Sequence, residues 1–154
     1  MTRTAARRLA VQLSFASSSG SDLAPAEFFD EEYFRALPPE GEIFEEMPDE
    51  AQMTYIRSLV DGVNEHRAEL DEYISRYSRG WKISRISRTA LAVLRCALYE
   101  IRYMPDIPVA AAINEAVELA KGYDEPETVS FINGILGSYV RDHAAELPER
   151  TGEE

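Results

Sequence analysis

The stretch SRISRTALAVLRCALYEIRYM, residues 84–104, decides the fold. Its apolar side chains recur at spacings of four, four, three and four residues, at Ile86, Ala90, Leu94, Ala97 and Ile101. This spacing gathers them on one side of an α-helix. Arg88, Arg95 and Arg102 recur every seven residues, about 130° around that helix from the apolar stripe. We predict a long helix whose apolar side is buried and whose arginines face water or a partner.

The segments on both sides of this stretch also predict helices. PDIPVAAAINEAVELAKGY, residues 105–123, places Pro108 at a first helical position and Gly122 just past the end. A last helix begins near Glu127, and Gly134 within it is interpreted as a close helix contact. Upstream, residues 4–17 and 49–78 carry helical apolar patterns, the second as one long helix or a broken pair. Residues 37–50, with three prolines and six acids, predict a solvated loop, so the chain is all-α.

A boundary between two halves is predicted where Gly80 precedes Trp81. With 154 residues, the chain has the length of one domain or of two small halves that share a core. We therefore expect an N-terminal helical half over residues 1–79, a C-terminal helical half over 80–147, and a short acidic tail over 148–154.

The charges are segregated along the chain. It carries 28 acids and 16 lysines and arginines, a formal net charge of -12, yet Arg3, Arg7 and Arg8 precede the first acid, Asp22. A field of this sign repels phosphate at long range, but salt screens it over about 8–10 Å, so a local basic surface can persist. The composition therefore leaves nucleic-acid binding open.

The first helix has its cations in an unfavourable place. On a helical projection Arg3 and Arg7 lie four residues apart, on the side away from Leu9 and Leu13. Like charges at this spacing repel, and cations oppose the positive end of the helix dipole. A bound phosphate would remove both penalties. From spacing alone, contact with RNA and plain solvation of these arginines are equally open.

No signature of an enzyme, a cofactor site or a metal site is found in the sequence. It has no glycine-rich phosphate loop, no paired cysteines and no HExxH motif. His66 and His143 are interpreted as surface histidines, and the single Cys96 as a small buried residue in a reducing cytoplasm. Arg95 interrupts the longest apolar run, so no membrane span is predicted. These features favour a protein that acts by binding.

Several segments carry a resemblance to a known family. They are AARRLAVQLSF at 5–15, LDEYI at 70–74, Trp81, LRCALYEIRYMPDIPVAAAINEAVELAKGY at 94–123, and FINGIL at 131–136. In order and spacing they resemble the bacterial transcription antitermination protein NusB family over nearly the full length of the chain. The resemblance implies a NusB-like helical bundle of two three-helix halves.

The resemblance also implies partners and site residues. NusB-like proteins pair with NusE, a small-subunit ribosomal protein, bind single-stranded boxA RNA in nascent rRNA transcripts, and support processive transcription in the RNA polymerase antitermination complex. At matching positions the implied RNA-binding residues are Arg3, Arg7, Arg8, Lys121, Glu127 and Phe131, with Phe131 as a base-stacking platform or a core aromatic. The implied partner-binding residues are Arg88, Arg95, Glu100 and Tyr103. The alternative is an RNA-independent scaffold that binds a ribosomal protein or forms a homodimer.

Overall fold

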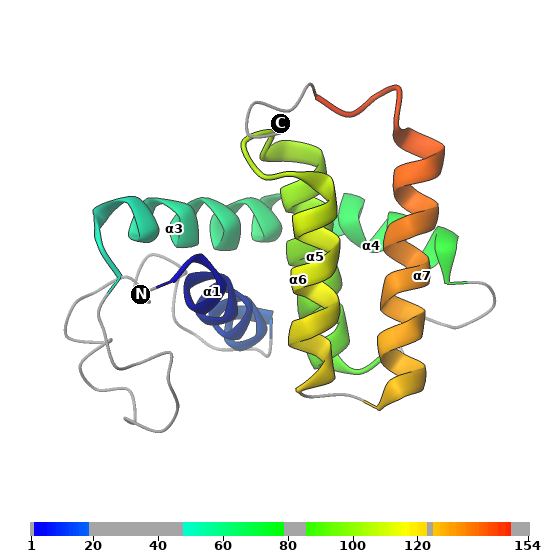
Figure 1. Cartoon of the computed structure of the whole chain (residues 1–154), viewed down its shortest axis with the longest axis horizontal. Coiled ribbons are helices and arrows are strands. Elements are labelled where there is room, and N and C mark those ends of the chain that lie inside the picture. The colour runs from blue at the N-terminus through cyan, green and yellow to red at the C-terminus, as the bar shows by residue number, and fades with distance from the viewer. Residues whose placement is uncertain (1, 19–47, 79–85, 123–124, 149–154) are drawn as a thin grey trace. The chain divides into compact units, whose positions relative to one another are not determined.

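The computed structural model describes residues 2–18, 48–78, 86–122 and 125–148, and every regular element in these ranges is an α-helix. The helices are α1 (Arg3–Ser18), α3 (Glu50–Glu65), α4 (Arg67–Tyr77), α5 (Arg88–Tyr103), α6 (Val109–Lys121) and α7 (Pro126–His143) (Figure 1). The predicted all-α class is confirmed. None of the described helices is long and apolar enough to cross a membrane.

Two compact units make up the chain, Met1–Glu65 and His66–Glu154. In the first, α1 packs on α3 through buried side chains that include Leu9, Leu13, Ile56 and Leu59. A reciprocal capping box starts α3: Gln52 N–H donates to Asp49 Oδ1 at 2.8 Å, and Asp49 N–H donates to Gln52 Oε1 at 2.9 Å. This cap satisfies two backbone donors that the first turn would leave unpaired.

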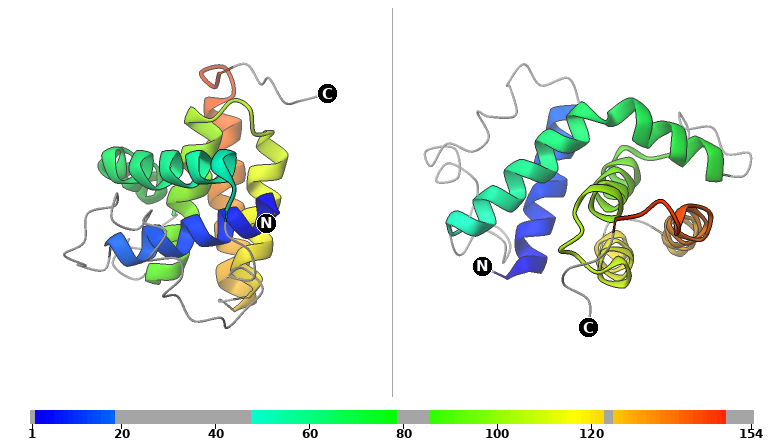
Figure 2. Two further views of the ribbon diagram at one scale, coloured as in Figure 1. Left: turned by 90° about the vertical axis from the view of Figure 1, so that its left-hand side faces the viewer. Right: turned by 90° about the horizontal axis from the view of Figure 1, so that it is seen from above.

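The second unit is a bundle of the four helices α4 to α7. Both α5 and α7 pack on α6 and on each other, and α4 contacts α5 and α7. The right-hand view of Figure 2 looks along α5, α6 and α7 and shows α4 lying across them. Ser87 Oγ accepts from Ala90 N–H at 3.1 Å to cap α5, and Pro126 occupies the first position of α7.

The apolar stripe predicted for α5 is confirmed, since its five members are all buried, with at most 7% exposure at Ile86. The prediction for Gly134 is wrong: a Cβ there would meet no atom of the described residues within 4 Å, so this glycine does not contact a neighbouring described helix closely. The division at 65/66 also lies N-terminal of the predicted 79/80 boundary, because α4 packs on α5 and α7. Gly80, Trp81 and most of the 37–50 loop lie outside the described residues.

Candidate nucleic-acid interface

The arginines of α1 lie in two different environments. Arg3 is exposed at the first position of the helix, and its guanidinium carbon is 4.6 Å from the centroid of the Tyr55 ring on α3. Arg7 is only 5% exposed, 5.8 Å from the same ring, and Arg8 is half-buried. The expectation that Arg7 lies on the side of α1 away from the core is therefore wrong.

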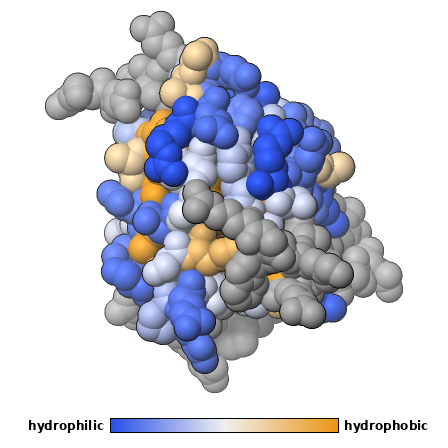
Figure 3. Space-filling view, turned by 90° about the vertical axis from the view of Figure 1, so that its right-hand side faces the viewer, coloured by the Kyte–Doolittle hydropathy of each residue, from blue (hydrophilic) through white to orange (hydrophobic). Residues whose placement is uncertain are grey.

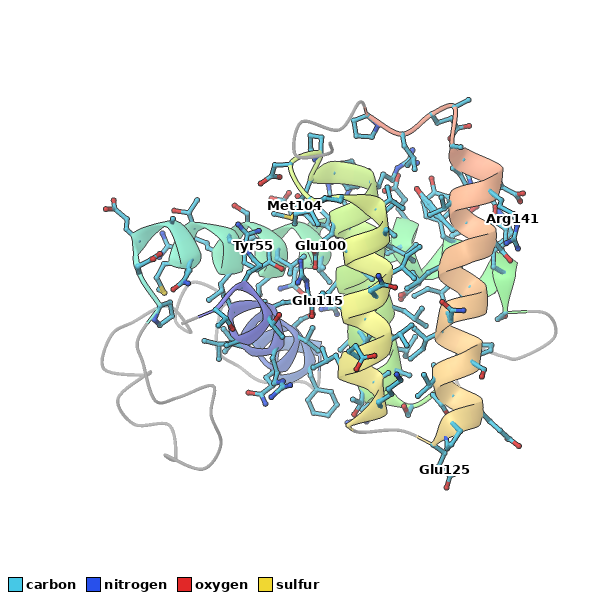
Figure 4. The ribbon with its side chains drawn as sticks, viewed as in Figure 1. Tyr55, Glu100, Met104, Glu115, Glu125 and Arg141 are labelled. Atoms are coloured by element: carbon cyan, nitrogen blue, oxygen red, sulfur yellow. The ribbon has the colours of Figure 1, made fainter. Side chains whose placement is uncertain are left out.

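The ring of Tyr55 explains how two cations are accommodated in the first turns of α1. An aromatic face attracts a guanidinium within about 6 Å, which offsets part of the repulsion between Arg3 and Arg7. Tyr55 itself is 6% exposed, so it presents a fixed surface. Figure 4 labels Tyr55 on α3. Arg3 and Arg8 keep part of their surface open to an anionic ligand.

The C-terminal candidates lie on α6 and α7. Lys121 ends α6 and forms an exposed ion pair with Glu118 at 2.8 Å, while Glu127 is exposed in the first turn of α7. One turn further along α7, Phe131 is half-buried and lines a pocket of about 320 Å³. Base stacking on this partly exposed aromatic side chain therefore stays a prediction.

The four candidates for partner binding on α5 divide into two pairs. Arg88 and Tyr103 are exposed at opposite ends of the helix, and Tyr103 Oη donates to Glu69 Oε1 at 2.5 Å. By contrast Arg95 is bonded within the unit, and Glu100 is 1% exposed. The Arg95 guanidinium makes two hydrogen bonds to Asp71 on α4, Nε to Oδ1 at 2.7 Å and Nη2 to Oδ2 at 3.0 Å.

A polar and aromatic cluster joins the ends of α4 and α7. His143 is 8% exposed, so the prediction of a surface histidine is wrong for this residue. Its Nε2 lies 3.1 Å from Tyr77 Oη, and its Nδ1 lies 2.9 Å from Glu146 Oε2. That hydrogen bond lowers the pKa of Glu146. The rings of Tyr73, Tyr77 and Tyr139 bury His143, and only the folded contact between α4 and α7 brings them together.

Arg102 also belongs to this cluster. Its Nη1 donates to Tyr139 Oη at 2.9 Å. Burial acts to lower the pKa of Arg102, but hydrogen bonds with Tyr139 and Tyr103 outweigh burial and raise it. Burial also raises the pKa of Tyr139. Among the described residues, no three His, Cys, Asp or Glu side chains gather in a way that could hold a metal ion.

Comparison with known proteins agrees with this architecture. The NusB family model matches residues 4–141. A transcription antitermination protein NusB from Carboxydothermus hydrogenoformans is 42% identical over 147 residues, covering 94% of this chain and 99% of that protein. Its counterpart in Alkaliphilus oremlandii is 38% identical over 149 residues, 97% of this chain and 100% of the relative.

Solved structures extend the likeness to the fold. T. maritima NusB superposes with a TM-score of 0.75 at 29% identity, over 94% of each chain. A structure of the antitermination factors NusB and NusE in complex with dsRNA has a TM-score of 0.69 at 20% identity, over 91% of this chain and 96% of that chain. The chain has the NusB fold and belongs to the NusB family.

Proposed function

We propose that this chain is a transcription antitermination factor. With NusE it binds the single-stranded boxA element of nascent rRNA transcripts, and it promotes processive transcription by RNA polymerase within the antitermination complex. The observation that carries this proposal is the family match over residues 4–141, which includes nearly all of α1 and most of α7. The protein acts in the cytoplasm, by binding rather than by catalysis.

The geometry of α1 supports phosphate contacts from Arg3 and Arg8. Both retain exposed surface, and the positive end of the helix dipole at the start of α1 attracts anions. Arg7 is buried against the ring of Tyr55, so we assign it a role in positioning α1 rather than a direct phosphate contact. Lys121 and Glu127, with Phe131, form the proposed RNA contacts of the second unit.

The proposed surface for NusE includes Arg88 and Tyr103. Tyr103 is the one large hydrophobic side chain exposed among the described residues, and it stacks on His66 at a centroid distance of 4.4 Å. An exposed aromatic with a polar tip is typical of protein interfaces. Arg95 is bonded to Asp71 and Glu100 is buried, so neither is proposed as a direct contact with NusE. The same patch would serve the alternative function, an RNA-independent scaffold or homodimer.

Charge removal at matched positions tests the RNA proposal. We expect Arg3→Gln and Arg8→Gln each to weaken binding of a fluorescent boxA-like RNA in the presence of NusE. Each should also reduce the slope of log affinity against log salt by about one, because one phosphate contact is lost. Arg57→Gln is the matched control, since Arg57 is an exposed arginine on α3 of the same unit.

The scaffold alternative predicts a different pattern. The wild-type chain would then bind NusE without any salt-sensitive RNA binding, and all three variants would keep the wild-type affinity for NusE. An equal effect of Arg57→Gln would mean that overall charge, rather than a surface on α1, determines the affinity.

A further inference from the structure

A pocket lies where the C-terminal end of α4 meets α7. Its volume is about 320 Å³, at the lower end of the range for small-molecule sites. Its walls come from the two helices, through Tyr77, Ser78, Phe131, Gly134, Ile135, Ser138 and Arg141. Figure 3 shows the molecule from the side of α7, where strongly hydrophilic groups border paler and apolar ones. Figure 4 shows Arg141 projecting from the outer side of α7.

The sequence of α7 builds one wall of this pocket. Phe131, Gly134, Ser138 and Arg141 follow one another at intervals of three, four and three residues, so they share one side of the helix. Within the part of the chain that the structure describes, a Cβ at Gly134 would meet no atom within 4 Å, so this glycine forms the open floor of the pocket. A flat ligand could rest on the backbone there, next to the Phe131 ring.

Arg141 gives the pocket a positive end. Its guanidinium lies back along the helix, where a Cβ at Gly137 would come within 3.6 Å of Nη1, and Nη2 donates to Ser138 Oγ at 3.1 Å. The structure gives this exposed guanidinium no carboxylate partner within the described part of the chain. On a chain with a net charge of -12, an arginine without an acidic partner favours an anionic ligand.

The opposite wall is held in place. Tyr77 Oη donates to Asp142 Oδ2 at 2.9 Å and lies 3.1 Å from His143 Nε2. The Tyr77 ring is nearly parallel to that of Tyr139, at 13°. Asp142, the acid next to Arg141 in sequence, is thereby directed at Tyr77.

We propose that this pocket binds one nucleotide of single-stranded RNA, with its base against Phe131 over Gly134 and its phosphate at Arg141. The inference rests on the proposed RNA-binding function. It adds Gly134, Tyr77 and Arg141 to Phe131 as residues of the RNA site. Stacking of a base on an aromatic ring holds single strands without reading sequence. Arginine pairs with phosphate through two parallel N–H donors, so both ends of the pocket suit one nucleotide.

Two variants test the pocket from different directions, with NusE and a boxA-like RNA in both cases. Gly134→Leu fills the floor without meeting other atoms at its Cβ, and we expect affinity for the RNA to fall about tenfold through lost stacking. Arg141→Gln removes the cationic end, and we expect weaker binding and a salt slope reduced by about one. Thermal unfolding of each variant checks that the fold is kept.

Two control variants make the same kinds of substitution at residues outside the pocket. Ser130→Leu places a leucine on an exposed position of α7, and Arg57→Gln removes an exposed arginine of α3. Both controls should leave the affinity for RNA unchanged. Should Gly134→Leu lose the fold, Arg141→Gln alone decides, because Arg141 is exposed and holds only a local hydrogen bond.

Failure of the pocket and failure of the proposed function give different results. Wild-type affinity in Arg141→Gln and in folded Gly134→Leu, with loss of affinity in Arg3→Gln and Arg8→Gln, overturns the pocket and leaves the RNA-binding function standing. Absence of RNA binding by the wild-type chain, with NusE association intact, overturns both.

Discussion

The ion pair between Arg95 and Asp71 should be a major contribution to the stability of the second unit. It joins α5 to α4 through two hydrogen bonds of 2.7 and 3.0 Å, and the side chains are only 12% and 28% exposed. A hydrogen bond to a charged group contributes about 1.5–3 kcal/mol, whereas exposed ion pairs contribute about 0–1 kcal/mol. Since Asp71 keeps some contact with water, we expect a coupling free energy of about 2 kcal/mol.

A double-mutant cycle measures this coupling. Arg95→Ala, Asp71→Ala and the double variant are unfolded in urea, and the free energies of unfolding are compared. Each single variant leaves a partly buried charge without its partner, so we expect each to lower the melting temperature by about 4–8 °C. The double variant should be less destabilised than the sum of the two.

The pair Arg76 and Glu72 is the matched control. It also joins an arginine to a carboxylate, at 3.1 Å within α4, but the side chains are 49% and 71% exposed. The same cycle on this pair should give a coupling several times smaller than that of Arg95 and Asp71. Equal couplings in the two cycles, or a coupling below about 0.5 kcal/mol for the partly buried pair, would refute the reasoning. The ion pair would then contribute no more to stability than an exposed one.

Three further predictions concern α1, α7 and the chain after α7. Arg7→Ala should destabilise the protein by about 1–2 kcal/mol through lost packing and the lost contact with Tyr55, while Arg8→Ala should change it by less than about 0.5 kcal/mol in urea unfolding. Gly134→Ala should stabilise α7 by about 0.5–1 kcal/mol, because the added methyl meets no atom; a lower melting temperature would contradict this. The pKa of Glu146 is lowered by its bond to His143, so that contribution to stability is present above the ordinary pKa of 4.5 and is lost as pH falls through the lowered value. Unfolding of Glu146→Gln followed into acid should therefore depend less on pH than that of the wild type.

Periodicity predicted the helices and the inner side of α5, because burial of an apolar stripe depends mainly on spacing along one helix. The same reasoning failed for Arg7 and for His143, whose surroundings come from other helices. Tyr55 on α3 provides the aromatic face for Arg7, and three tyrosines of α4 and α7 surround His143. No pattern within one segment reports a partner that lies elsewhere in the sequence.

The sequence predicted single residues of the candidate site but not the pocket that they form. The resemblance indicated Phe131, but the pocket beside it depends on the contact between α4 and α7. Gly134 illustrates the reason: a glycine within a helix signals either a close neighbour or an open surface, and only the structure distinguishes them. The regular spacing of Phe131, Gly134, Ser138 and Arg141 was present in the sequence and could have indicated a shared face.

The measurement that tests the central claim most directly is fluorescence anisotropy of a boxA-like RNA, titrated with this protein at two salt concentrations, with and without NusE. Our account predicts binding that tightens when NusE is present and weakens steeply as salt rises, because phosphate contacts release counterions. Binding to NusE without any affinity for the RNA, at either salt concentration, would contradict the account and identify the protein as a scaffold.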